Sequence, residues 1–210
     1  MSLFATLFES SIRHISGGFG RKLRYLYYRR RLGHCGKNVI IDEGVYFSNL
    51  KDIFIANDVW IDKNCILIAG PAISSKNSKF HKNSHYTKEL GQIHIGHSSH
   101  IGINTILQGH AGIQIDEYFT SSAGCKLYSL SNDYKKCKYG TTGKEEIHYI
   151  SSPIKIGKNV WLGLNVSVIS TTINNDCFIL SNSVVSDYLE ANCVAKGAPA
   201  IKVKNRFNEE

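Results

Sequence analysis

Aliphatic residues recur along this chain at six-residue steps, and small or polar residues fill the positions between them. Two consecutive units run from Ile55 to Trp60 and from Ile61 to Ile66. A period of six fits neither an amphipathic helix nor a long alternating strand. A short fixed period indicates identical turns stacked on one another, each with short strands and tight corners. The pattern therefore predicts a repeat fold whose core forms only when the coils stack.

Three positions of the six-residue unit have a recognisable character. The first is aliphatic and is expected to point inward. The second is often Gly, Asp or Asn, which we expect to turn the backbone. The fifth is small, which suits a narrow interior: Val59, Cys65, Ser99, Thr105, Cys125, Val160, Val166, Cys177 and Ser183. An ordinary β-sandwich is the alternative, but its turns would not keep a six-residue register.

Residues 1–34 do not follow the repeat. Their pattern predicts an N-terminal helical segment, which precedes a repeat domain over residues 35–207. An apolar stripe at helical spacing ends at Gly17 and Gly18, and a basic, tyrosine-rich run follows over residues 21–31. Two interpretations of this run stay open. It caps the open end of the stack, as repeat proteins require, or it contacts an anionic membrane surface.

The repeat is interrupted twice, by polar and aperiodic stretches at residues 69–92 and 129–152. We expect each to be a loop that protrudes from a corner of the stack. Long loops on a rigid scaffold often carry functional residues. Both are therefore candidates for part of a binding or catalytic site.

Composition narrows the class of partner and the compartment. The 210 residues carry a formal net charge of +8, which favours an anionic partner. No aromatic-basic recognition motif accompanies the charge, so coenzyme phosphates or an anionic membrane are expected rather than nucleic acid. The six cysteines form no CxxC pair, so no zinc site is expected. No signal peptide or transmembrane segment is visible, and we expect a cytoplasmic protein. If residues 21–31 contact a membrane, it is the inner face of the cytoplasmic membrane.

Two segments give the chain a resemblance to a known family. They run from Pro153 to Gly163 and from Ala195 to Lys204. With the repeat over about residues 39–207, they resemble the hexapeptide-repeat acyltransferases, and most closely the sugar O-acetyltransferase branch. The resemblance implies an all-β fold, a left-handed parallel β-helix. It also implies a homotrimer that holds acetyl-CoA in the groove between neighbouring chains. The implied reaction is acetyl transfer to a saccharide hydroxyl, on a surface or capsular polysaccharide or its precursor.

The same resemblance implies a set of residues that contact the coenzyme. Trp161 matches a tryptophan beside the pantetheine groove, with a packing role as the alternative. Residues whose backbone or side chains meet the coenzyme, and lysines that meet its phosphates, follow by register: Leu164, Ser181, Ser186, Lys202 and Lys204. A lysine needs only to bring its charge within reach of a phosphate. The alternative for the two lysines is a solvated basic tail.

Acetyl transfer to an alcohol needs a base for the hydroxyl proton and a donor for the oxyanion. The resemblance implies a histidine base at the start of the second interruption. That place falls within residues 130–134, where Asn132 and Asp133 stand instead. Three interpretations stay open. Asp133 acts as the base, although an ordinary carboxylate is weak at pH 7. Another histidine acts as the base, and His110 is the best candidate for it. Or the chain is a non-catalytic homologue.

The remaining histidines give two further hypotheses. His81 and His85 in the first loop, and His148 in the second, would line an acceptor pocket, or they are solvent-exposed surface residues. A metalloenzyme like the carbonic anhydrases of this fold needs three converging histidines. The candidates are His94, His97, His100 and His110, but the first three are spaced for corners and strand faces of one coil, so no metal site is expected.

Overall fold

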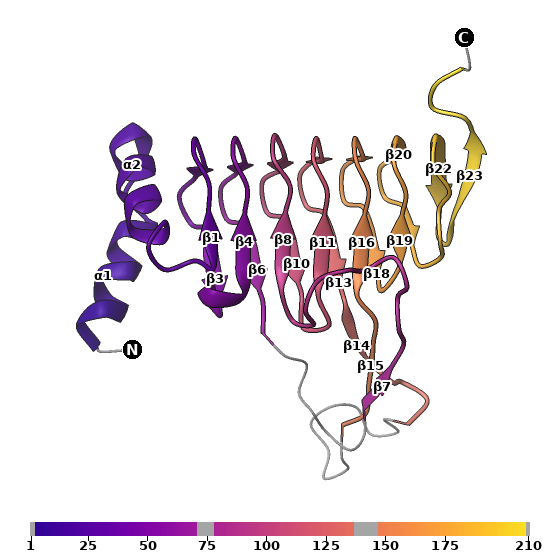
Figure 1. The fold of residues 1–210 in the computed structure, drawn as a ribbon, viewed down its shortest axis with the longest axis horizontal. Helices are drawn as coiled ribbons and strands as arrows, with labels where there is room; N and C mark the ends of the chain where they lie inside the picture. The colour runs from indigo at the N-terminus through magenta and orange to yellow at the C-terminus, as the bar shows by residue number, and fades with distance from the viewer. Residues whose placement is uncertain (1–2, 71–77, 137–146, 209–210) are drawn as a thin grey trace.

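A computed structural model describes residues 3–70, 78–136 and 147–208. The chain is a left-handed parallel β-helix with two helices at its N-terminal end, which confirms the predicted fold class. Figure 1 shows the coils side by side, with the helices at one end of the stack and the C-terminus at the other.

Three sheets form the sides of the β-helix, and their strands are parallel except for the last strand of sheet B. Sheet A contains β1 (His34–Cys35), β4 (Ile53–Ile55), β8 (Ile93–Ile95), β11 (Ile113–Ile115), β16 (Ile154–Ile156) and β19 (Thr172–Ile173). Sheet B contains β2 (Ile40–Ile41), β5 (Trp60–Ile61), β9 (His100–Ile101), β12 (Thr120–Ser121), β17 (Trp161–Leu162), β20 (Cys177–Ile179), β22 (Cys193–Gly197) and β23 (Ala200–Lys204). Sheet C contains β3 (Tyr46–Ser48), β6 (Ile66–Ile68), β10 (Ile106–Gln108), β13 (Lys126–Tyr128), β18 (Ser167–Ile169) and β21 (Val184–Val185).

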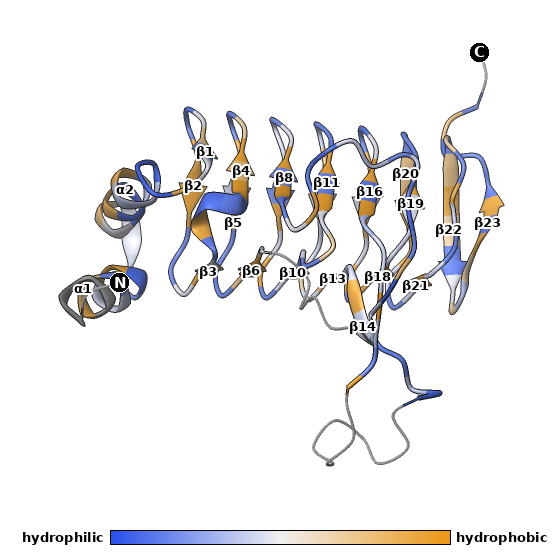
Figure 2. Cartoon of the chain, turned by 60° about the horizontal axis from the view of Figure 1, so that its bottom comes forward, coloured by the Kyte–Doolittle hydropathy of each residue, from blue (hydrophilic) through white to orange (hydrophobic). Residues whose placement is uncertain are grey.

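The interior is a set of columns in which equivalent residues stack coil upon coil. First-position side chains such as Ile61, Ile101 and Leu162 are fully buried, and Figure 2 shows the hydrophobic strands between polar corners. The fifth position is small and buried, as expected, except at Phe119. Ser121 takes an aliphatic position two residues later in the same coil, so a large and a small residue exchange places at similar total volume.

The corners differ from the expectation that second-position residues turn the backbone. The left-handed residue is the fourth of the unit, with φ between 53° and 78°: Asn38, Gly44, Asp58, Asn64, Ser98, Asn104, Tyr118, Gly124, Asn159, Asn165, Asp176, Asn182 and Asn192. Asn, Asp and Gly tolerate this region best. The second-position Gly96 is needed for another reason, because a Cβ there would lie 2.4 Å from the backbone carbon of Asp116.

The two N-terminal helices are α1 (Leu3–Arg13) and α2 (Gly17–Tyr28), and α2 covers the open end of the first coil. Tyr28 is fully buried and its ring packs edge-on against Phe47 at 4.8 Å. The Arg24 guanidinium is also buried, where Nε donates to the carbonyl oxygen of Ile41 and Nη1 to that of Ile12. The segment therefore caps the stack. Within the described residues, no helix is long and apolar enough to cross a membrane.

Both interruptions leave the stack at the corner between sheets C and A, and they meet in a small sheet of their own. We call it the arm sheet. It contains β7 (Ser78–Phe80), β14 (Leu130–Asn132) and β15 (Tyr149–Ser151). β15 pairs antiparallel with β14 and parallel with β7. The loops thus protrude as expected but carry ordered strands, while residues 71–77 and 137–146 lie outside the described part (Figure 1).

Candidate functional site

A groove of about 460 Å³ lies on the outer face of sheet B, near the C-terminal end of the stack. Aromatic and aliphatic side chains form its walls and two cations stand at its edge. The lining residues are Trp161, Phe178, Leu180, Val194, Lys204 and Arg206. An apolar wall beside fixed positive charge suits an extended ligand that has a phosphate end and an uncharged arm.

The strand register explains why the walls of this groove are aromatic. First-position residues point inward, so the residue before each of them on sheet B points outward. Trp161, Phe178 and Val194 hold this outward position on three consecutive strands. The Trp161 ring lies edge-on to Phe178 at 5.8 Å, and its Nε1 donates to Ser122 Oγ at 3.3 Å. The indole is therefore held in place while 47 % of the residue stays exposed.

The cations come from the C-terminal segment, where β23 folds back antiparallel to β22. Lys204 lines the groove. Arg206 joins it, and its Nη1 donates to the carbonyl oxygens of Asn159 and Cys177, which orients the guanidinium. Lys202 instead forms an ion pair with Glu190 at 2.5 Å. The sequence motif indicated Lys202 and Lys204, but it did not identify Arg206.

The other residues expected at the coenzyme divide into two places. Leu164 and Ser181 are neighbours at the corner that follows the Trp161 strand, where the Leu164 amide donates to Ser181 Oγ at 3.1 Å. Ser186 follows β21 and lies at the corner between sheets C and A, where its hydroxyl donates to Asp187. The structure therefore places Leu164 and Ser181, but not Ser186, beside the strand that carries Trp161.

The residues expected to include the base lie on the arm sheet. The Asp133 amide donates to the carbonyl oxygen of His148 at 2.8 Å, and Asn132 pairs with Tyr149 across the same hairpin. Asp133 is largely buried, and its Oδ1 accepts a hydrogen bond from the Lys135 amide at 3.2 Å. That contact closes a local turn. The arm thus brings Asn132, Asp133 and His148 together, away from the sheet B groove of the same chain.

The other candidate histidines are spread along the same corner and the first loop. His110 stands between the bases of the two loops, with Nδ1 3.4 Å from the carbonyl oxygen of Gly70. His81 is exposed at the end of β7, where its amide donates to the carbonyl oxygen of Ser151. His85 is exposed and its ring lies 5.5 Å from that of Tyr188. The structure does not gather these side chains at one point.

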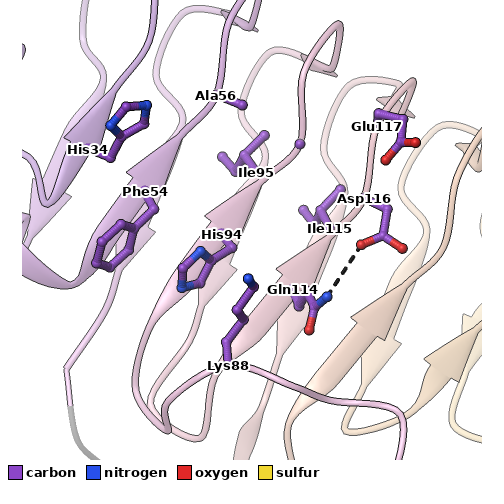
Figure 3. Close-up of a pocket in the computed structure, with 11 residues that line it drawn as sticks. His34, Phe54, Ala56, Lys88, His94, Ile95, Gln114, Ile115, Asp116 and Glu117 are labelled. Carbon is purple, nitrogen blue, oxygen red and sulfur yellow. Dashed lines mark hydrogen bonds between the residues drawn. The ribbon is translucent and has the colours of Figure 1, made fainter.

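A second hollow, of about 350 Å³, lies on sheet A under the returning segment of the first loop (Figure 3). The rings of Phe54 and His94 stack in parallel at 4.4 Å, and Lys88 comes from the loop beside them. Gln114 holds the loop by accepting hydrogen bonds from Thr87. Burial, together with the positive charge of Lys88, lowers the pKa of His94 from 6.5 to about 4. His94 is therefore uncharged at neutral pH.

The first three of the four histidines considered for a metal point in different directions. His94 lies on sheet A, His97 lies at the following corner against Tyr118, and His100 lies on sheet B. Among the described residues, no group of three or more His, Cys, Asp or Glu side chains is arranged to hold a metal ion. This placement gives no support to the carbonic-anhydrase-like alternative.

The fold and the groove together define a left-handed β-helix of hexapeptide repeats with a candidate coenzyme groove. No family model matches the chain. The chain is 31 % identical over 144 residues to "Probable acetyltransferase Rv3034c" of Mycobacterium tuberculosis, a match that covers 58 % of this chain and 47 % of that protein. The chain therefore spans about half the length of this relative.

Two further proteins are similar over most of the chain. A "dTDP-4-amino-4,6-dideoxy-D-glucose acyltransferase" of Escherichia coli is 28 % identical over 175 residues, which are 81 % of each chain. The structure of AntD, an N-acyltransferase from Bacillus cereus in complex with dTDP and 3-hydroxybutyryl-CoA, matches with a TM-score of 0.70. It is 22 % identical, and 87 % of each chain is covered. At that identity the likeness to AntD establishes the fold.

Proposed function

We propose that this chain transfers an acyl group, acetyl in the simplest case, from acyl-CoA to a saccharide hydroxyl. The acceptor would be a surface or capsular polysaccharide or its precursor. The sheet B groove carries the proposal. Its apolar wall of Trp161 and Phe178 suits the uncharged pantetheine arm, and Lys204 and Arg206 suit the phosphates. The names of the similar proteins support acyl transfer as the reaction class.

A second acceptor, the amino group of an amino sugar, is favoured by one specific observation. Residues 130–134 hold Asn132 and Asp133 where the resemblance implies a histidine base. A neutral amine can attack a thioester before it loses a proton, whereas a hydroxyl needs a base in the same step. The E. coli relative is named for an amino-sugar acceptor, which supports this candidate. A non-catalytic homologue remains the alternative in which neither acceptor reacts.

The roles of individual residues are part of the proposal. Trp161, Leu164, Ser181 and Lys204 contact the coenzyme, with Arg206 added from the structure. Ser186 and Lys202 stand apart from the groove, and contacts to them would require a neighbouring chain or a change of partner.

His81, His85 and His148 are the acceptor-site candidates from the loops, and the candidates for the base are His110, Asn132 and Asp133. We propose that they act at the groove of an adjacent subunit, because the arm sheet lies away from the groove of its own chain. A homotrimer would provide this arrangement. Its measured mass in solution would be three times the 23.5 kDa of the chain.

We also propose that the N-terminal cap contacts an anionic lipid surface. Residues 1–34 hold seven Lys or Arg and one Glu, so they contribute +6 of the net charge of +8. Phe19, Lys22, Leu26, Arg29 and Arg30 are exposed and lie at helical spacing opposite the buried Arg24. A cap needs a polar outer face, so two exposed apolar side chains among cations indicate a lipid partner. A second copy is disfavoured because two such faces repel each other.

Coenzyme binding and turnover test the reaction separately. Acetyl-CoA should raise the unfolding temperature of the protein. Trp161→Ala or Lys204→Ala should need an acetyl-CoA concentration about tenfold higher for the same rise. Lys51→Ala, at an exposed lysine outside the groove, is the matched control. Turnover would be followed as free thiol with sugars and amino sugars, each free and linked to a nucleoside diphosphate. Absence of binding at millimolar acetyl-CoA would contradict the proposal.

A further inference from the structure

The outer face of sheet B continues from the groove toward the N-terminal coils as a single column of side chains. Trp161 pairs with Thr120 on the next strand, and Thr120 pairs with His100 on the one after. Strands in a sheet lie ~4.8 Å apart, so the backbones at His100 and Trp161 are roughly 10 Å apart. His100 is thus on the same face as the groove, a relation that no sequence motif indicated.

A carboxylate and an indole hold the His100 ring in place. Its Nε2 lies 2.9 Å from Asp62 Oδ2, and its ring lies 5.4 Å from that of Trp60. Trp60 is itself held, because its Nε1 donates to Asp42 at 3.2 Å. The His100 side chain nevertheless stays 42 % exposed. An imidazole that is oriented by a carboxylate and open to solvent is the arrangement of a general base.

The hydrogen bond to Asp62 leaves a specific nitrogen for chemistry. When Nε2–H donates to the carboxylate, Nδ1 carries the lone pair. In the described part of the chain, no hydrogen bond is seen at His100 Nδ1. That nitrogen is therefore the proton acceptor that the pair offers.

The position along the column fits the donor end of the coenzyme. A coenzyme whose phosphates meet Lys204 and Arg206 runs along the column past Trp161 toward Thr120. The Arg206 guanidinium reaches the carbonyl oxygen of Cys177 on β20, and three strand steps separate β20 from β9 through β17 and β12. That is ~14 Å at the spacing of strands, within the reach of an extended phosphopantetheine arm. The thioester would then lie near His100.

We propose that His100, oriented by Asp62, is the general base of the acyl transfer, an inference that rests on the proposed function. The acceptor oxygen attacks the thioester carbonyl and forms the new C–O bond while Nδ1 takes the hydroxyl proton. The tetrahedral intermediate then collapses, the C–S bond breaks, and the CoA thiolate receives the proton from the imidazolium. The products are the sugar ester and free CoA thiol, so no other reactant is needed. Asp62 acts through His100 and is a positioning residue.

The test compares His100→Gln with a matched histidine in the same coil. His97→Gln is the control, since His97 is exposed at a corner outside the groove. His100→Gln should lower kcat by roughly a hundredfold or more, which is the usual contribution of a general base. KM for acetyl-CoA should change by less than about threefold, because groove contacts are kept. The fall of kcat/KM toward acid pH should disappear in His100→Gln. Asp62→Asn should lower kcat less and displace that limb of the profile.

Two results separate this inference from the reaction itself. Turnover of His100→Gln that matches the unchanged protein, with the same pH profile, overturns the role of His100 and leaves the reaction standing. If turnover is lost in His110→Gln or Asp133→Asn instead, the base is that residue, which also overturns the role of His100 and leaves the reaction standing. Absence of turnover by the unchanged protein with every acceptor overturns the proposed function, and the base with it. Coenzyme-induced stabilisation of each variant shows whether it is folded.

Discussion

At the scale of single residues, His94 gives the clearest link between burial and pH. Burial, with Lys88 nearby, lowers its pKa from 6.5 to about 4, while Phe54 stacks on its ring. Between these pH values the unfolded chain binds a proton at this residue and the folded chain does not. Stability therefore falls as pH falls through this window. Because the site is only partly buried, the loss of unfolding free energy should be roughly 1–2 kcal/mol, less than the full pKa shift would correspond to.

The variant His94→Phe should remove this dependence, because it keeps a ring against Phe54 but cannot bind a proton. The unfolding free energy of the unchanged protein, minus that of the variant, should decrease from pH 6.5 to pH 4. Urea unfolding at several pH values measures it. His97→Phe, at an exposed imidazole, is the control. A difference that does not vary with pH would contradict the burial of His94 as the cause.

Residue-scale chemistry was only partly predictable from the sequence. The motif around Trp161 and the tail with Lys204 indicated a coenzyme groove, and the structure brings those two together. Arg206 was missed because its position depends on the antiparallel return of β23. The pairing of His100 with Asp62 could not be foreseen, because Asp62 lies 38 residues earlier, on the other side of the first loop. Short spacing patterns do not detect such pairs.

At the scale of a single coil, the second-position glycines set how closely neighbouring corners stack. A Cβ at Gly96 would lie 2.4 Å from the backbone carbon of Asp116 and 2.5 Å from the amide nitrogen of Glu117. Backbone atoms cannot move aside as a flexible side chain can. Gly96→Ala should therefore lower the unfolding free energy by roughly 1–3 kcal/mol, the usual cost of overpacking.

Thermal and urea unfolding would measure this cost. The control is Ala56→Gly, because Ala56 occupies the same position of the preceding coil and already has a Cβ. It should cost less than about 1 kcal/mol, which is the entropic effect of glycine alone. Equal stability of Gly96→Ala and the unchanged protein would show that the corner relaxes, and that close approach does not select glycine.

The elements themselves show where periodicity is informative. The six-residue step predicted the coils because each coil repeats the same inward and outward positions. It could not predict that the loops after β6 and β13 pair with each other, since β7 and β15 are about 70 residues apart. Nor did it locate the turn residue, because Gly, Asp and Asn occur at both the second and the fourth position. Only the backbone separates close approach from positive φ.

At the scale of the whole molecule, the charge is concentrated at one end of the stack. The cap holds +6 of the net charge of +8, and its outer face exposes Phe19 and Leu26, at 69 % and 50 %. Each Lys or Arg near an anionic bilayer contributes ~1 kcal/mol, and salt screens the attraction. The apolar side chains would add burial at the headgroup boundary. This end should face a membrane while the groove at the other end stays in water.

Co-sedimentation with lipid vesicles tests that orientation. The full chain should bind vesicles of phosphatidylcholine with phosphatidylserine, and binding should weaken steeply as salt rises. It should not bind phosphatidylcholine alone.

The double variant Phe19→Ser with Leu26→Ser should lose binding at moderate salt, and Lys22→Glu should weaken it. Lys126→Glu is the control, because it makes the same change of charge on sheet C and should not weaken binding. Because these cap residues are exposed, the variants should keep the unfolding temperature of the unchanged protein. Binding that is absent from anionic vesicles, or equal for Lys22→Glu and Lys126→Glu, would assign the exposed cap to another partner.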